Sequence, residues 1–148
     1  MWDLSGYALL ALSAFTSATL LPGSSEVVLA ALWYQGGDPW LLWLVATCAN
    51  CAGSLVNWWL GSQVGRFQHK PWFPASPEQI QRAQQWSFKF GPYAILLSWL
   101  PVIGDPLTVA AGILRYPLWQ FMALVLLAKG TRYGVLLLAA DTFLKGLV

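Results

Sequence analysis

The chain has 148 residues, of which 57% are hydrophobic and only 9% are charged, and its formal net charge is +2. Soluble globular domains carry about 25% charged residues, so this composition excludes a water-soluble domain and indicates an integral membrane protein. A charge this small also argues against a nucleic-acid partner, because no basic stripe is available to neutralise phosphates.

The first apolar run, residues 4–21, is uncharged and nearly long enough to cross a hydrocarbon core of about 30 Å. The start of the chain lacks the basic region of a secretory signal, so we expect this run to be retained. It is broken at residues 22–25, and residues 26–35 then cover only about half of the core at about 1.5 Å per residue. Residues 4–35 therefore form either one kinked span or a re-entrant hairpin.

Residues 40–61 are long enough for a complete transmembrane helix. Tryptophans at both ends of this run are typical of the aromatic belts at membrane interfaces; they are Trp40, Trp43, Trp58 and Trp59. One helix face carries small and polar residues, namely Asn50, Gly53, Ser54 and Asn57. Two interpretations stay open, helix packing through these side chains or the lining of a polar path. The glycines at 61 and 65 match a small-xxx-small pattern, which is compatible with a homo-oligomer.

Cys48 and Cys51 lie in the same run, and the one histidine, His69, lies in a polar loop. A zinc site needs two further ligands, so we expect no metal and no other cofactor. Small side chains packing inside a membrane helix are the simpler interpretation of the cysteines, and a membrane thiol redox pair is the alternative.

Residues 62–89 form the polar middle of the chain. Basic residues outnumber acidic ones there, which predicts a cytoplasmic loop by the positive-inside rule. The run Ser-Pro-Glu-Gln at 76–79 predicts a helix N-terminus with a capping box. We expect the helix that follows to rest its apolar side chains on the membrane surface; these are Ile80, Ala83, Trp86 and Phe90.

Two further apolar stretches, residues 90–100 and 106–114, are each too short to cross alone. A hairpin that dips in from the cytoplasm and returns explains them best. Residues 117–144 form the last long span, and it contains Lys129 and Arg132 on one helix face.

The two breaks share a pattern: Leu-Pro, a glycine nearby, and a carboxylate four residues after the proline, namely Glu26 or Asp105. Proline stops or kinks a helix and glycine frees the backbone, so we predict re-entrant breaks at Pro22, Gly23, Pro101 and Gly104. Matching interruptions in two halves indicate a transport site at the interface of an inverted repeat.

Superposing Glu26 on Asp105 carries Asn50 onto Lys129. The prediction is an all-α polytopic protein with a single membrane domain over residues 1–148. Its parts are repeat one at 4–62, a cytoplasmic linker with an amphipathic helix at 63–89, and repeat two at 90–145. Each repeat is a broken hairpin followed by a crossing helix, so the two must be inverted.

Ionisable groups inside a membrane are functional hypotheses by default. We predict a substrate- and proton-binding site that contains Glu26, Asp105, Lys129, Arg132, Asn50 and Asn57. If no cation lies close to Glu26, this carboxylate would exchange protons and couple transport to the proton gradient. Arg132 would hold a phosphate bidentately with Lys129 beside it. The alternative is that Asp105 with Lys129 or Arg132 is only a structural ion pair.

Several motifs resemble the DedA family, whose conserved region is the VTT domain, over most of residues 15–135. They are Ser-Ala-Thr-Leu-Leu-Pro-Gly-Ser-Ser-Glu-Val at 17–27, Gly-Ser-Leu-Val-Asn-Trp-Trp-Leu-Gly at 53–61, and Leu-Leu-Ser-Trp-Leu-Pro-Val-Ile-Gly-Asp at 96–105. The chain is most similar to the short bacterial branch called YqaA.

This resemblance implies a bacterial inner-membrane protein with two re-entrant hairpins in inverted halves, and Glu26 matches the family's essential acid. Relatives are linked to proton-dependent transport, to return of the undecaprenyl phosphate carrier, and to phospholipid scrambling. The chain departs from larger relatives at Ser54, where they carry aspartate, and at Ser98 and Gly104, where they carry arginines.

We therefore expect a transporter or lipid translocase that is coupled to protons and moves an anionic, phosphate-bearing amphipath. Its partners would be membrane lipids, and the sequence is compatible with a homo-oligomer. A scaffold for envelope maintenance and a small-ion transporter are the alternatives. We expect no enzyme activity and no catalytic residues, because no nucleophile and base occur at recognisable spacing.

Overall fold

The computed structural model describes residues 4–18, 24–64, 69–72, 76–100 and 103–147. Every element among these residues is a helix, which confirms the predicted all-α class. The elements are α1 (Leu4–Ser17), α2 (Ser24–Tyr34), α3 (Pro39–Ser62), α5 (Pro77–Phe90), the 3-10 helix η1 (Gly91–Trp99), α6 (Gly104–Ile113) and α7 (Leu118–Gly146).

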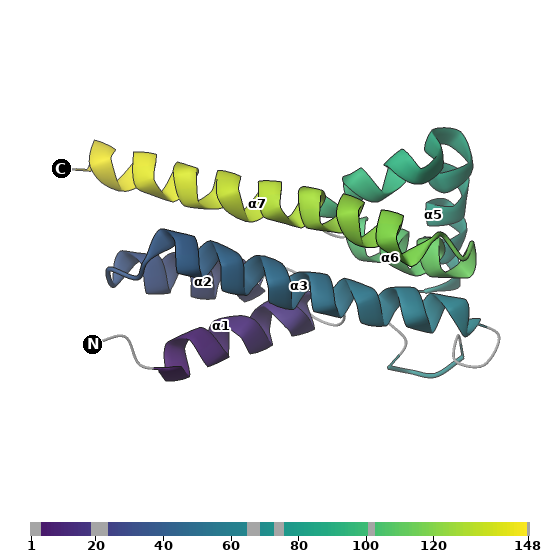
Figure 1. Ribbon diagram of the computed structural model, residues 1–148, viewed down its shortest axis with the longest axis horizontal. Helices are drawn as coiled ribbons and strands as arrows, with labels where there is room; N and C mark the ends of the chain where they lie inside the picture. The colour runs from purple at the N-terminus through teal and green to yellow at the C-terminus, as the bar shows by residue number, and fades with distance from the viewer. Residues whose placement is uncertain (1–3, 19–23, 65–68, 73–75, 101–102, 148) are drawn as a thin grey trace.

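Helices α3 and α7 run along the whole length of the molecule and pack against each other (Figure 1). They have 24 and 29 residues and are both long and apolar enough to cross a membrane. Their bounds match the runs predicted at 40–61 and 117–144 within a few residues. The two long helices therefore form the frame on which the shorter elements are placed.

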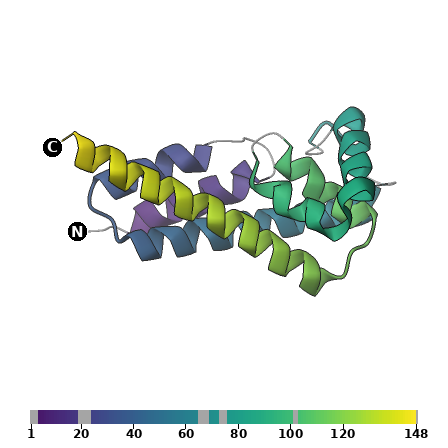
Figure 2. The ribbon, with the colours of Figure 1, turned by 90° about the horizontal axis from the view of Figure 1, so that it is seen from above.

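The shorter helices occupy opposite halves of this frame (Figures 1 and 2). α1 runs from the N-terminal end toward the middle, and α2 returns beside it to the start of α3. In the other half, η1 and α6 pack together next to α5, and α6 leads back to the start of α7. Each half of the chain thus goes toward the middle and comes back.

Of the four residues predicted to form the breaks, the structure describes one, Gly104. Pro22, Gly23 and Pro101 fall outside the described residues. Gly104 opens α6, and a Cβ atom there would overlap the carbonyl oxygen of Ser98. Only glycine therefore lets η1 and α6 come this close.

Glu26 and Asp105 both lie in the first turn of the second helix of their pair, α2 and α6 respectively. The N-terminal turn of a helix carries partial positive charge and unpaired N–H groups, which stabilise a carboxylate. The two acids therefore have matching places in the two halves.

The capping box predicted for α5 is confirmed, because Ser76 and Gln79 exchange side-chain to backbone hydrogen bonds of 3.2 and 2.9 Å. The predicted membrane-surface face is wrong for Ile80 and Ala83. Both are buried and pack on residues of α6, since α6 offers an apolar surface directly beside α5.

Gly61, which suggested a dimer contact, is instead used inside the chain. A Cβ atom on Gly61 would overlap the carbonyl oxygen of Val109, and one on Gly112 would overlap that of Trp58. Helices α3 and α6 therefore meet backbone to backbone, as small residues allow in membrane helix pairs. This contact removes the reason for assigning Gly61 to a homo-oligomer.

Candidate functional site

Arg132 is the central residue of α7, with fourteen helical residues on each side, and Lys129 lies one turn before it. Each cation contacts a carboxylate from a different half of the chain. Arg132 Nη2 binds Glu26 Oε1 of α2, and Lys129 Nζ lies 3.4 Å from Asp105 Oδ1 of α6. One helix face therefore connects both hairpins through charge pairs.

This pairing determines which cation each acid contacts. Asp105 pairs with Lys129, while Arg132 binds Glu26. The condition that Glu26 has no close cation is therefore not met.

The two pairs differ in accessibility. The side chains of Lys129 and Asp105 are 1% and 20% exposed, whereas those of Arg132 and Glu26 are 14% and 33% exposed. An ammonium buried to this extent is costly unless it is paired. Lys129 is thus fixed by Asp105, and the Glu26–Arg132 pair is the one that a ligand can approach.

Asn50, at the middle of α3, binds the end of α1. Its Nδ2 donates hydrogen bonds to the carbonyl oxygen of Ala14 at 2.8 Å and to Ser17 Oγ at 3.0 Å. Ala14 carries one of the last four carbonyls of α1, which lack backbone N–H partners within their own helix, and the Ser17 hydroxyl donates to the same oxygen at 3.0 Å. The amide of Asn50 therefore adds a second hydrogen bond at the end of α1.

Asn57 has a similar role two turns along. Its Nδ2 donates to the carbonyl oxygen of Ala18 at 2.7 Å and to Thr108 Oγ1 of α6 at 3.1 Å. Asn57 thus contacts both halves of the chain. The sequence left open whether this polar face packs helices or lines a polar path. The hydrogen bonds donated by both asparagine nitrogens support helix packing.

Sequence reasoning missed a hydroxyl contact next to the Glu26–Arg132 pair. Ser25 Oγ and Tyr133 Oη lie 2.8 Å apart, and Ser17 Oγ donates to Ser25 Oγ at 3.1 Å. Tyr133 is 1% exposed. In the sequence, Ser25 is next to Glu26 and Tyr133 is next to Arg132. This adjacency could have indicated the contact, since neighbouring positions can both bridge the same two helices.

Comparison with known proteins identifies the family of this chain. The VTT domain matches residues 21–142. The inner membrane protein YqaA of Escherichia coli (strain K12) is 40% identical over 122 residues, which cover 82% of this chain and 81% of that protein. The chain belongs to the VTT-domain (DedA) family.

Two more distant relatives cover most of the chain as well. An uncharacterized protein of Haemophilus influenzae is 34% identical over 152 residues, which cover 97% of this chain and 92% of that protein. The uncharacterized protein MJ0201 of Methanocaldococcus jannaschii is 25% identical over 134 residues. No solved structure matches this VTT-domain chain.

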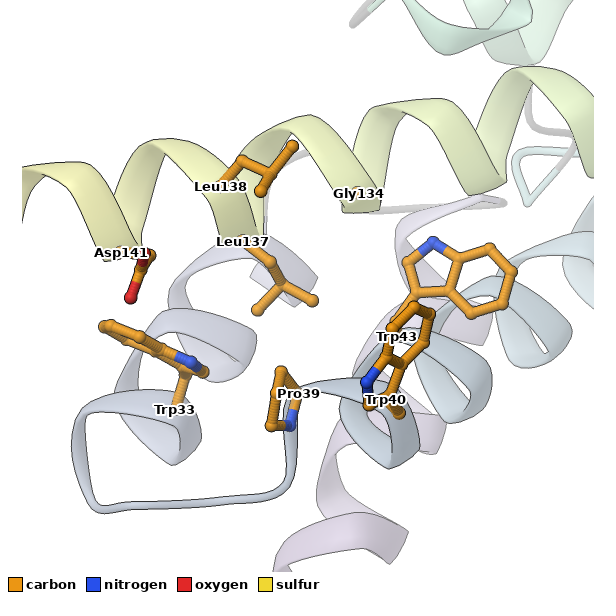
Figure 3. A pocket seen from close by; sticks show the side chains of 8 residues that line it. All are labelled: Trp33, Pro39, Trp40, Trp43, Gly134, Leu137, Leu138 and Asp141. Carbon is orange, nitrogen blue, oxygen red and sulfur yellow. The ribbon is translucent and has the colours of Figure 1, made fainter.

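An apolar groove of about 440 Å³ lies between the α2–α3 turn and the second half of α7 in this VTT-domain protein (Figure 3). It is lined by Trp33, Pro39, Trp40, Trp43, Gly134, Leu137, Leu138 and Asp141. Asp141 and Trp33 lie at one end and Trp43 and Gly134 at the other (Figure 3). Trp43 Nε1 donates to the carbonyl oxygen of Gly130 at 2.8 Å, so this end of the groove reaches the centre of α7.

The end of α7 carries an exposed charge pair. Lys145 Nζ and Asp141 Oδ2 lie 2.6 Å apart, with side chains 76% and 40% exposed. An exposed i,i+4 pair of this kind contributes little to stability. It therefore gives a useful control for the buried pairs.

Asp105→Asn should destabilise the protein by about 3 kcal/mol or more, because it leaves the buried Lys129 ammonium without its partner. Adding Lys129→Met should restore most of the loss, since the double variant has no buried charge at this point. Unfolding in detergent micelles measures both, with Lys145→Met as the control that breaks an exposed pair. A double variant as unstable as Asp105→Asn alone would contradict the coupling of these two residues.

Proposed function

We propose that the protein is a membrane transporter or lipid translocase that moves an anionic amphipath with a phosphate head group. The observation that carries this proposal is the position of Arg132. It lies at the centre of a 29-residue apolar helix and is bound by a carboxylate from a broken hairpin. Ionisable residues inside a membrane-spanning helix are rare and are functional-site hypotheses by default.

Arg132 suits a phosphate better than a lysine would. A guanidinium presents two parallel N–H donors to phosphate oxygens, whereas an ammonium acts as a point charge. The Glu26–Arg132 pair is also the more accessible of the two pairs. A phosphate would therefore reach Arg132 first, with Lys129 one turn away as a second positive charge.

Substrate binding would exchange one anion for another. The phosphate takes the place of the Glu26 carboxylate on Arg132, and the Glu26–Arg132 contact opens. A carboxylate that loses a neighbouring cation takes up a proton more readily. The released Glu26 would carry that proton until the phosphate leaves, which links substrate movement to proton movement.

The apolar part of such a substrate has a place in the groove. Aromatic and aliphatic side chains form most of its wall, and its inner end lies at Trp43, which is bonded to Gly130 of α7. Gly130 is two residues from Arg132. A hydrocarbon tail in the groove would thus leave the head group near the charged centre.

We also propose an inner-membrane location with residues 62–89 in the cytoplasm. The relative YqaA is named an inner membrane protein. Five basic or histidine residues against one acid in this loop favour the cytoplasmic side.

Transport in proteoliposomes tests the function. Labelled polyprenyl phosphate and a labelled phospholipid should cross faster with the wild type than in protein-free vesicles. Charged hydrogen bonds contribute about 1.5 to 3 kcal/mol, so Arg132→Gln should slow transport by about tenfold to a hundredfold. Glu26→Gln should keep binding but lose the dependence of the rate on a pH gradient.

Two variants serve as controls for this assay. Arg132→Lys keeps the charge and removes the bidentate geometry, so it should fall between the wild type and Arg132→Gln. Lys145→Gln changes an exposed cation and should leave the rate unchanged. A folded wild type that moves neither lipid would favour a small-ion transporter or a scaffold.

Topology is tested by cysteine labelling after both native cysteines are replaced with alanine. Gln85 of α5 and Gln35 of the α2–α3 turn are both exposed, and these two elements lie at opposite ends of the molecule (Figure 1). In intact spheroplasts an impermeant thiol reagent should label Gln35→Cys and not Gln85→Cys. The reverse pattern would overturn the cytoplasmic assignment of the loop.

A further inference from the structure

One face of α3 carries buried polar atoms that have no hydrogen-bond partner in the described part of the chain. They are Thr47 Oγ1, Asn50 Oδ1, Ser54 Oγ, Asn57 Oδ1 and Trp58 Nε1. Buried polar atoms in native proteins are almost always bonded, either to protein or to ordered water. A row of five such atoms on one helix therefore points to a bound polar ligand.

The spacing of the row fits small bridging molecules. Ser54 is four residues from Asn50 and three from Asn57, so its Cβ atom is about 5 to 6 Å from that of each asparagine. The three side chains are 2%, 0% and 0% exposed. One molecule that makes two hydrogen bonds of about 2.8 Å spans a gap of this size.

The direction of the two amide oxygens is fixed by their nitrogens. Asn50 Nδ2 donates to the carbonyl oxygen of Ala14, and Asn57 Nδ2 donates to that of Ala18. A carbonyl oxygen can only accept, so neither amide can be turned around. Both amides therefore present acceptor oxygens to the unpaired row.

Water fits this row better than a metal cation does. A cation would suit the oxygens, but Trp58 Nε1 is a hydrogen-bond donor and would face it with the same sign of charge. The nearby carboxylates are already paired with Lys129 and Arg132. Water both donates and accepts, so it satisfies all of these atoms without adding charge.

The two asparagines contact different parts of the chain. Asn50 binds Ser17, whose hydroxyl donates to Ser25 beside Tyr133. Asn57 binds Ala18 of the first half and Thr108 of α6. Ser54 lies between the two asparagines, so water on this row would lie where both halves of the chain meet α3.

We propose that bound water joins Asn50, Ser54 and Asn57 and forms a buried hydration site between the two hairpins. The water donates to the amide oxygens of both asparagines and bonds the Ser54 hydroxyl, which can donate as well as accept. This inference goes beyond the proposed function and does not rest on it, because the water can be tested without transport.

Asparagine labelling gives a direct test, because Asn50 and Asn57 are the only asparagines in the sequence. Solid-state NMR of protein labelled with [15N]asparagine in lipid vesicles should show both side-chain amides receiving magnetisation rapidly from water. Ser54→Val fills the gap and removes the hydroxyl, so it should slow this transfer several-fold. Ala52→Val, an exposed position on the same helix, should leave it unchanged.

Ser54→Ala, the milder variant, removes the hydroxyl without filling the gap, so both amides should keep their contact with water. Amides without water contact in the wild type, or contact unaffected by Ser54→Val, would overturn the hydration site. None of these outcomes depends on whether the wild type moves a lipid.

Discussion

Two charge pairs on one face of α7 hold this fold together and define its centre. Lys129 and Arg132 each bind a carboxylate that lies in the first turn of a short helix, α6 for Lys129 and α2 for Arg132. An unpaired charge in this position would be costly, so each hairpin is placed where its acid can reach α7.

The two pairs have different parts in the account. The buried Lys129 is closed off by Asp105 and secures the second hairpin, while Arg132 and Glu26 remain partly accessible. A substrate phosphate can displace Glu26 only if it binds Arg132 about as strongly as Glu26 does. A carboxylate and a phosphate make hydrogen bonds of comparable strength to a guanidinium. Such a site can release its own acid when a substrate arrives.

Features set by local sequence were predictable. The helices at Pro39–Ser62 and Leu118–Gly146 follow from apolar length, and the start of α5 follows from its capping box. The partners of Glu26 and Asp105 were not predictable, since cations three residues apart lie within reach of either acid. Tyr133 and Ser25, and the burial of Ile80 and Ala83 on α6, depend on which helices meet, and neither periodicity nor propensity contains that information.

The central claim is that Arg132 changes partner from Glu26 to a substrate phosphate. Solid-state NMR distances between 15N-labelled arginine and 31P of added polyprenyl phosphate test it most directly, with the Arg132 signal assigned from its loss in Arg132→Lys. The account predicts close nitrogen–phosphorus contact at Arg132 and loss of its contact with 13C-labelled Glu26. An Arg132 signal that keeps its Glu26 contact and shows no phosphorus nearby would contradict it.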